Sequence, residues 1–215
     1  MFTEVISKSR QDLLARLKDS HLLMNFYLAG GTGAALHLGH RKSEDFDFFS
    51  STGFDPEMLA IALGKREDFE VSNSGAGTLH GLVKDTKLSF LLYEYPLLFP
   101  IVDFHGIVLA DLRDIALMKI TAIAGRGSNK DFVDLFFICQ QTISLGELLL
   151  DLFPRKYSSK LYSMYHIMRS LQYFDDAEVN PPLEMLRPMV WNDVKKFFLD
   201  ETEKLIKENL MDRQR

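Results

Sequence analysis

The fold is decided by residues 28–50, which read LAGGTGAALHLGHRKSEDFDFFS. The apolar run NFYLA, residues 25–29, ends at two glycines and predicts a strand followed by a turn. Residues 32–38 then predict a short helix, and the strict alternation of DFDFF over 45–49 predicts a second strand. We therefore expect this segment to fold as strand, glycine turn, helix and strand.

Acidic residues occupy one face of the second predicted strand. Side chains alternate along a strand, so Asp45 and Asp47 point one way together with Ser43, while Phe46 and Phe48 point the other. The two aspartate Cα atoms are then about 6.5 Å apart. Two carboxylates at that spacing repel, and a divalent cation such as Mg²⁺ or Mn²⁺ relieves the repulsion. The alternative is an edge strand with a hydrated acidic face, and the spacing alone leaves both interpretations open.

The Gly30-Gly31-Thr32 turn is suited to binding phosphate. Glycines let a ligand approach the backbone, and the first turn of a helix offers unbonded N–H groups and partial positive charge. The turn lacks the Gly-Lys-Ser/Thr of a P-loop, and Leu36 stands where a dinucleotide fingerprint needs its third glycine. A tight turn without a ligand is the alternative interpretation.

The rest of the chain predicts an α+β core followed by helices. From Asp111 onward the pattern is helical, with Asn180-Pro181-Pro182 as the main break. We expect two parts, an α+β domain over 1–150 and a C-terminal helical subdomain over 151–215. The elements expected before Asp111 are helices over 4–19 and 55–66 and strands over 68–73, 78–84, 87–94 and about 100–109.

The predicted helix over 111–125 carries a lysine in an apolar stripe. Lys119 lies near the middle of a stripe about 100° wide, and Gly125 is the expected terminator. Buried lysine is costly unless it is paired. One interpretation is a lysine whose stem is buried and whose ammonium reaches the surface. The other aims Lys119 into a cleft, toward phosphates or the two aspartates.

Composition excludes several classes of protein. The 215 residues carry a net charge of −5, and the acidic excess falls in the first 154 residues, which argues against an extended DNA-binding or RNA-binding surface. A single cysteine, Cys139, excludes an internal disulfide and a cysteine-based zinc site. We find no signal peptide and no apolar run long enough for a membrane span, so we expect a cytoplasmic protein.

The combination of a Gly-Gly-Thr turn and Asp-Phe-Asp resembles nucleotidyltransferases of the polymerase-β type. The longer string GGTGAALHLGHRKSEDFDFFS resembles the AbiEii/AbiGii toxin family of nucleotidyltransferases in particular. The likeness continues at 119–137, KITAIAGRGSNKDFVDLFF, and more weakly at 170–178 and 191–198. The resemblance implies a nucleotidyltransferase-like mixed sheet with flanking helices, followed by a C-terminal helical bundle.

The resemblance also implies which residues form the active site. Asp45 and Asp47 would bind Mg²⁺ or Mn²⁺, and Lys119 and Asp131 would complete the catalytic group. Asp131 would position or deprotonate the acceptor, and Asp134 is a less certain second acid. The residues that would bind the NTP are Gly30, Gly31, Thr32, Arg41, Ser43 and Arg126. The fuller pattern has a third metal carboxylate on a later strand, for which Glu94 and Asp103 are the candidates.

The implied reaction moves a nucleoside monophosphate from an NTP to an RNA or protein acceptor. Some members of this family are toxins of bacterial toxin–antitoxin pairs, so the implied partners are the NTP, the acceptor and an antitoxin protein. The alternative is a catalytically silent module of the same fold that acts by binding a nucleotide or a protein.

Overall fold

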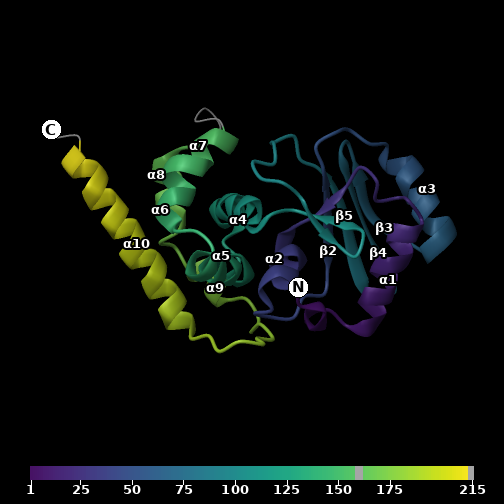
Figure 1. The fold of residues 1–215 in the computed structure, drawn as a ribbon, viewed down its shortest axis with the longest axis horizontal. Coiled ribbons are helices and arrows are strands. Elements are labelled where there is room, and N and C mark those ends of the chain that lie inside the picture. The colour runs from purple at the N-terminus through teal and green to yellow at the C-terminus, as the bar shows by residue number, and fades with distance from the viewer. Residues whose placement is uncertain (158–161, 213–215) are drawn as a thin grey trace. The chain divides into compact units, whose positions relative to one another are not determined.

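The computed structural model describes residues 1–157 and 162–212, which form two compact units (Figure 1). The first unit, Met1–Asp111, combines a sheet with helices, and the second, Leu112–Arg215, is helical. The predicted α+β class is confirmed, with a mixed sheet, flanking helices and a C-terminal helical region. The helical part begins at Leu112, next to the position predicted for it.

The observed division lies earlier in the chain than the one we expected between residues 150 and 151. The segment before residue 150 packs with later helices, because helix α4 (Leu112–Arg126) contacts both η2 (Leu148–Leu152) and α8 (Met164–Ser170). Residues 143–154 therefore lie inside the second unit and not at its boundary.

The first unit contains the glycine turn and the acidic strand. Its helices are η1 (Thr3–Val5), α1 (Lys8–Asp19), α2 (Gly30–Leu38) and α3 (Pro56–Glu67). Its strands are β1 (Tyr27–Leu28), β2 (Phe46–Ser50), β3 (Glu70–Gly75), β4 (Thr78–Val83), β5 (Thr86–Leu92), β6 (Val102–Phe104) and β7 (Ile107–Leu109). A turn at His105-Gly106 joins β6 to β7 and divides the strand expected over about 100–109.

Side-chain caps fix the starts of two helices in this unit. The Ser7 hydroxyl accepts the backbone N–H of Arg10 at the start of α1. The Asp55 carboxylate accepts two N–H groups at the start of α3, from Glu57 at 2.9 Å and Met58 at 3.1 Å. Both caps satisfy backbone donors that have no partner inside the helix.

Strand β2 lies inside the sheet, between β1 and β5. Among the described residues the strand order is β3-β4-β5-β2-β1-β7-β6. β1 runs antiparallel to β2 with Tyr27 opposite Phe49, and β5 runs parallel to β2 with Ser89 opposite Asp47. The interpretation of 45–49 as an edge strand is therefore wrong, because β2 has a hydrogen-bonded neighbour on each side.

The core of the first unit lies on the face of β2 opposite to the aspartates. Phe46 and Phe48 are fully buried, and the ring of Phe48 stacks on Phe90 of β5 at 5.2 Å. Leu17 of α1 and Leu63 of α3 belong to the same core, and Figure 1 shows these two helices beside the sheet. The core therefore fixes which face of β2 carries Asp45 and Asp47.

The second unit is a set of helices around an aromatic core. Besides α4, η2 and α8 it contains α5 (Asn129–Gln141), α6 (Leu145–Glu147), α7 (Phe153–Lys156), α9 (Asp175–Glu178) and α10 (Trp191–Asp212). Phe132 of α5 is fully buried. Its ring centroid lies 5.1 Å from that of Phe174 and 5.4 Å from that of Phe198 of α10. The core therefore joins α5 to the end of the chain.

Helix α4 extends slightly further than its sequence predicts. It ends at Arg126, and Gly127 adopts the left-handed conformation (φ +57°) that commonly ends a helix. Gly125, the expected terminator, lies inside the helix. Two glycines two residues apart both satisfy the pattern, and only Gly127 has the backbone conformation of a terminator.

Within the described residues, no single helix is both long and apolar enough to span a bilayer. Only the pair formed by Asn129–Gln141 and Leu145–Lys156 meets the criteria of length and composition, and that pair is bent by 111°.

Candidate active site

The N-terminus of α2 presents backbone N–H groups beside β2. Ala29 continues the β1–β2 pairing, since its N–H donates to the Asp47 carbonyl at 3.1 Å. The Gly33 N–H donates to the Ala29 carbonyl at 2.9 Å and begins the helical ladder. The N–H groups of Gly30, Gly31 and Thr32 therefore lie in the first turn, before the hydrogen bonds within the helix begin. Such N–H groups bind anions at the start of a helix.

Gly30 lies directly against the side chain of Asp47. A Cβ atom built on Gly30 would meet the Asp47 Oδ2 atom at 2.6 Å, and Gly30 has a left-handed φ of +62°. Both the backbone conformation and the contact therefore require glycine. The helix start and one carboxylate thus share a single location in the first unit.

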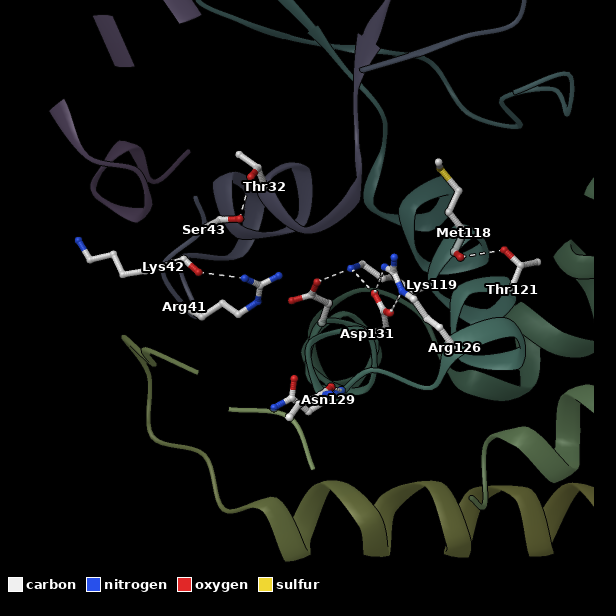
Figure 2. Close-up of polar contacts among 12 residues, drawn as sticks. Thr32, Arg41, Lys42, Ser43, Met118, Lys119, Thr121, Arg126, Asn129 and Asp131 are labelled. Carbon is white, nitrogen blue, oxygen red and sulfur yellow. Dashed lines mark hydrogen bonds and ion pairs between the residues drawn. The ribbon is translucent and has the colours of Figure 1, made fainter. Parts of the chain in front are cut away.

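Two hydroxyl groups hold the first turn of α2 to the segment before β2. The Thr32 Oγ1 atom lies 2.7 Å from the Ser43 Oγ atom and donates to the backbone carbonyl of Asp45. Thr32 and Ser43 are buried, and Figure 2 shows their hydroxyl groups turned toward each other. The neighbouring Arg41 is buried as well, and its Nη1 donates to the Lys42 carbonyl at 2.9 Å. This part of the site is therefore fixed by buried hydrogen bonds.

Asp45 and Asp47 are the carboxylates available for a metal ion in this unit. Both are partly exposed, whereas the alternating Phe46 and Phe48 are buried. Within the described residues there is no cluster of three or more His, Cys, Asp or Glu side chains that could hold a metal. Two carboxylates beside a helix N-terminus nevertheless fit Mg²⁺, which is commonly held by one or two protein carboxylates together with phosphate oxygens.

Neither candidate for a third carboxylate is close to this pair. Glu94 follows the C-terminal end of β5, well beyond Ser89, which is the residue opposite Asp47. Asp103 lies on β6, three strands away from β2, or about 14 Å at the usual spacing. Its Oδ2 atom accepts the Gly106 N–H at 3.3 Å and so stabilises the β6–β7 turn. Neither candidate therefore adds a third carboxylate to Asp45 and Asp47.

The remaining predicted site residues form an ion cluster in the second unit, together with Asp134. The Lys119 Nζ atom lies 2.8 Å from Asp131 Oδ1 and 2.6 Å from Asp134 Oδ2, and both carboxylates are fully buried. The Nε atom of Arg126 donates to Asp131 Oδ2 at 2.9 Å, and its Nη2 donates to Oδ1 at 3.2 Å (Figure 2). Lys119 itself is 3% exposed, so it is not a lysine whose ammonium reaches the surface.

The electrostatics of this cluster favour an ionised Asp131. Burial alone would raise the pKa of its carboxyl group, but the charge of Lys119 and the hydrogen bond and charge of Arg126 together hold that pKa below its usual value. Asp131 is therefore a weak base at neutral pH and a strong partner for the two cations.

Asp134 belongs to this cluster as fully as Asp131, although the sequence analysis ranked it below Asp131. It binds Lys119 as closely as Asp131 does. The spacing of Asp131 and Asp134, three residues apart on one helix, puts both on the same side of α5. That spacing is the signal in the sequence, and the contacts of Lys119 with both carboxylates give it its meaning.

Comparison with known proteins gives two matches at the level of sequence. The profile described as "Nucleotidyl transferase AbiEii toxin, Type IV TA system" matches residues 12–76, the segment that contains the glycine turn and both aspartates. The uncharacterized protein aq_aa25 of Aquifex aeolicus is 36% identical over 197 residues, which cover 90% of this chain and 94% of that protein.

Solved structures show where this fold occurs. A crystal structure of an H. pylori protein assigned as a nucleotidyltransferase aligns with a TM-score of 0.56 at 15% identity, over 93% of this chain and 94% of that one. The crystal structure of JHP933 from Helicobacter pylori aligns with a TM-score of 0.52 at 17% identity, over 98% and 100% of the two chains. At such low identity these structures show the fold alone. On the two sequence matches, the chain belongs to the AbiEii family, whose profile is described as a nucleotidyl transferase toxin.

Proposed function

We propose that this protein transfers a nucleoside monophosphate from an NTP to an RNA or protein acceptor, as the toxin of a toxin–antitoxin pair. The observation that supports the proposal is the contact between Gly30 and Asp47, because a helix start suited to binding phosphate lies beside a carboxylate suited to binding a metal ion. We place the reaction in the cytoplasm, where NTPs are available, and we take the antitoxin to be a separate protein.

The residues of the first unit would bind and orient the NTP. The N–H groups of residues 30–32 donate to the triphosphate, and Thr32 keeps them in place through Ser43. Arg41 adds positive charge for the phosphates. Asp45 and Asp47 would hold Mg²⁺ or Mn²⁺, which when bound neutralises charge on the phosphate oxygens.

The transfer itself exchanges one phosphate bond for another. The acceptor oxygen forms a bond to the α-phosphorus, the bond from that phosphorus to the α–β bridging oxygen breaks, and pyrophosphate leaves. The proton of the acceptor hydroxyl group passes to water. The protein contributes mainly by aligning the acceptor with the leaving pyrophosphate and by stabilising charge.

The ion cluster of the second unit would supply positive charge to the phosphates. The Arg126 side chain is 61% exposed and Lys119 is almost fully buried, so Arg126 is the more accessible cation. Asp131 and Asp134 fix Lys119, and Asp131 also fixes Arg126. We assign Asp131 a positioning role, because its lowered pKa makes it a poor proton acceptor.

The proposal is tested first by binding. Adding Mg²⁺ with ATP, GTP, CTP or UTP should raise the melting temperature of the wild-type protein, since a ligand that binds the folded state stabilises it. Asp45→Asn and Asp47→Asn should remove that shift. Glu44→Gln is the matched control, because Glu44 is exposed and its loss removes the same charge next to the site. No shift with any of the four nucleotides would refute the proposal.

Transfer is then tested with labelled NTPs. Wild type and Asp47→Ala are incubated with total cellular RNA or with a protein extract, and label is followed into each fraction. Label that depends on Asp47 supports transfer and identifies the acceptor class. Nucleotide-dependent stabilisation without any transfer would instead support a silent nucleotide-binding module.

A further inference from the structure

Aromatic rings continue the face of β2 that carries the aspartates. Phe49 follows Asp47 by two residues, so its side chain points to the same face, about 6.6 Å further along the strand. Opposite Phe49 on β1 is Tyr27, and their rings stack with centroids 5.9 Å apart. Asp45, Asp47 and Phe49 therefore form a row, in that order, from acids to an aromatic ring.

Strand β5 extends this row at its aromatic end. Ser89 lies opposite Asp47 and Leu91 opposite Phe49, and the Tyr93 N–H donates to the Ser50 carbonyl at 2.7 Å. The ring of Tyr93 packs edge to face against the rings of Phe49 and Tyr95, with ring centroids 5.7 Å and 5.1 Å apart. We call Tyr27, Phe49, Tyr93 and Tyr95 the aromatic row.

Tyr27 is buried, whereas the other three members of the aromatic row lie outside the buried core of this unit. That core lies on the opposite face of the sheet, around Phe46, Phe48 and Phe90. Phe49, Tyr93 and Tyr95 each keep part of their surface exposed. Partly exposed aromatic rings next to a phosphate and metal site have the chemistry that stacks on a nucleobase, because every base has a π-face.

We propose that the aromatic row binds the base of the donor NTP while residues 30–32 and the two aspartates bind its triphosphate. This rests on the proposed function and adds a base subsite to it. Phe49, the first ring of the row, lies two residues along β2 from Asp47. The ribose of the NTP would span the distance between the base on the row and the triphosphate beside Asp47. The row presents ring faces and edges, and we therefore expect it to stack on purines more strongly than on pyrimidines.

The test compares two probes that share a triphosphate and differ in the base. Calorimetry measures the affinity of Mg²⁺-ATP and of Mg²⁺-tripolyphosphate for wild type, Phe49→Leu and Tyr93→Leu. We expect wild type to prefer ATP, and each variant to bind ATP roughly tenfold to a hundredfold more weakly with tripolyphosphate binding unchanged. Phe49→Tyr keeps the ring and should bind ATP nearly as well as wild type. Tyr165→Leu removes an exposed ring of the second unit and is the matched control.

Each outcome has one interpretation. If wild type binds both probes equally, or if Phe49→Leu and Tyr93→Leu keep the wild-type ratio of affinities, the base subsite is wrong while the proposed function stands. If wild type binds tripolyphosphate but the variants lose both probes together with their melting temperature, the rings are structural and the base subsite is again wrong. If wild type binds neither probe, the proposed function fails with it.

Discussion

Gly30 and Asp47 are seventeen positions apart in the numbering, yet a single added methyl group on Gly30 would overlap the Asp47 carboxylate, with its carbon 2.6 Å from Oδ2. The antiparallel pairing of β1 with β2 creates this contact, since it sets the end of β1 beside Asp47. The glycine is therefore needed both for the turn and for the room that the carboxylate occupies.

Gly30→Ala should destabilise the protein by more than its backbone conformation alone explains. Alanine at a left-handed φ costs about 1–2 kcal/mol, and at Gly30 the new methyl group also displaces the Asp47 side chain. Gly127→Ala is the matched control, because Gly127 has a similar φ of +57° and its nearest contact would be an ordinary 3.6 Å. Free energies of unfolding from urea titration would measure both. Equal losses of unfolding free energy in Gly30→Ala and Gly127→Ala would show that the Asp47 side chain does not crowd the new methyl group.

The same substitution should also change ligand binding. Displacing Asp47 separates the carboxylate from the helix start, so Gly30→Ala should lose the melting-temperature increase given by Mg²⁺-ATP. Gly127→Ala should retain it, although its starting melting temperature is lower. An unchanged increase in Gly30→Ala would mean that the Gly30–Asp47 contact does not matter for the nucleotide.

A buried ion pair links the start of α4 to α7 in the second unit. Lys156 Nζ lies 2.5 Å from Asp114 Oδ1, and both side chains are fully buried. Removing one partner leaves an uncompensated buried charge, so Asp114→Asn should lower the free energy of unfolding by about 3–5 kcal/mol. Urea titration would measure the loss. The exposed pair of Glu203 and Lys207 is the control, and Glu203→Gln should change stability by less than about 1 kcal/mol.

Replacing both partners of this pair tests whether its charges or its volume stabilise the fold. Asp114→Leu combined with Lys156→Met fills the space with apolar atoms and should be close to wild type in stability. A double variant as unstable as Asp114→Asn would show that hydrogen bonds of this pair, and not merely charge balance, hold α4 and α7 together.

The sequence predicts those parts of the site that depend on local geometry. The glycine turn and the two aspartates need only strand alternation and the start of a helix. The position of Lys119 within an apolar stripe is compatible with an ammonium at the surface and with one aimed at phosphates or the two aspartates, and its observed partners on α5 depend on how two helices pack. The strand order, which separates Asp103 from β2, and the packing of α4 with η2 and α8 depend on contacts distant in sequence. No local pattern encodes those contacts.

Acid should destabilise the second unit through Asp131. Its pKa is lower in the folded protein than in the unfolded chain, where an aspartic acid titrates at about 3.9. The unfolded state therefore binds the proton first, and the stabilisation is fully present above that pH and is lost as the pH falls toward the folded pKa. The free energy of unfolding, measured between about pH 5 and 3, should fall less steeply in Asp131→Asn than in wild type. Equal slopes would show that Asp131 does not titrate in this range.

His37 should make stability depend on pH closer to neutrality. Burial lowers its pKa, and the hydrogen bond of its Nε2 with the Ala110 carbonyl, at 2.9 Å, only partly offsets that effect. The unfolded chain then takes up the proton first as the pH falls below about 6.5, so the folded state loses stability from there downward until His37 is protonated as well. An NMR titration of the His37 ring should give a midpoint below about 6.5. The slope of the unfolding free energy near pH 6 should be smaller in His37→Gln, which removes the titrating group. A midpoint at or above the usual histidine value would mean that the Ala110 carbonyl outweighs burial, and stability would then rise, or stay constant, as the solution is acidified.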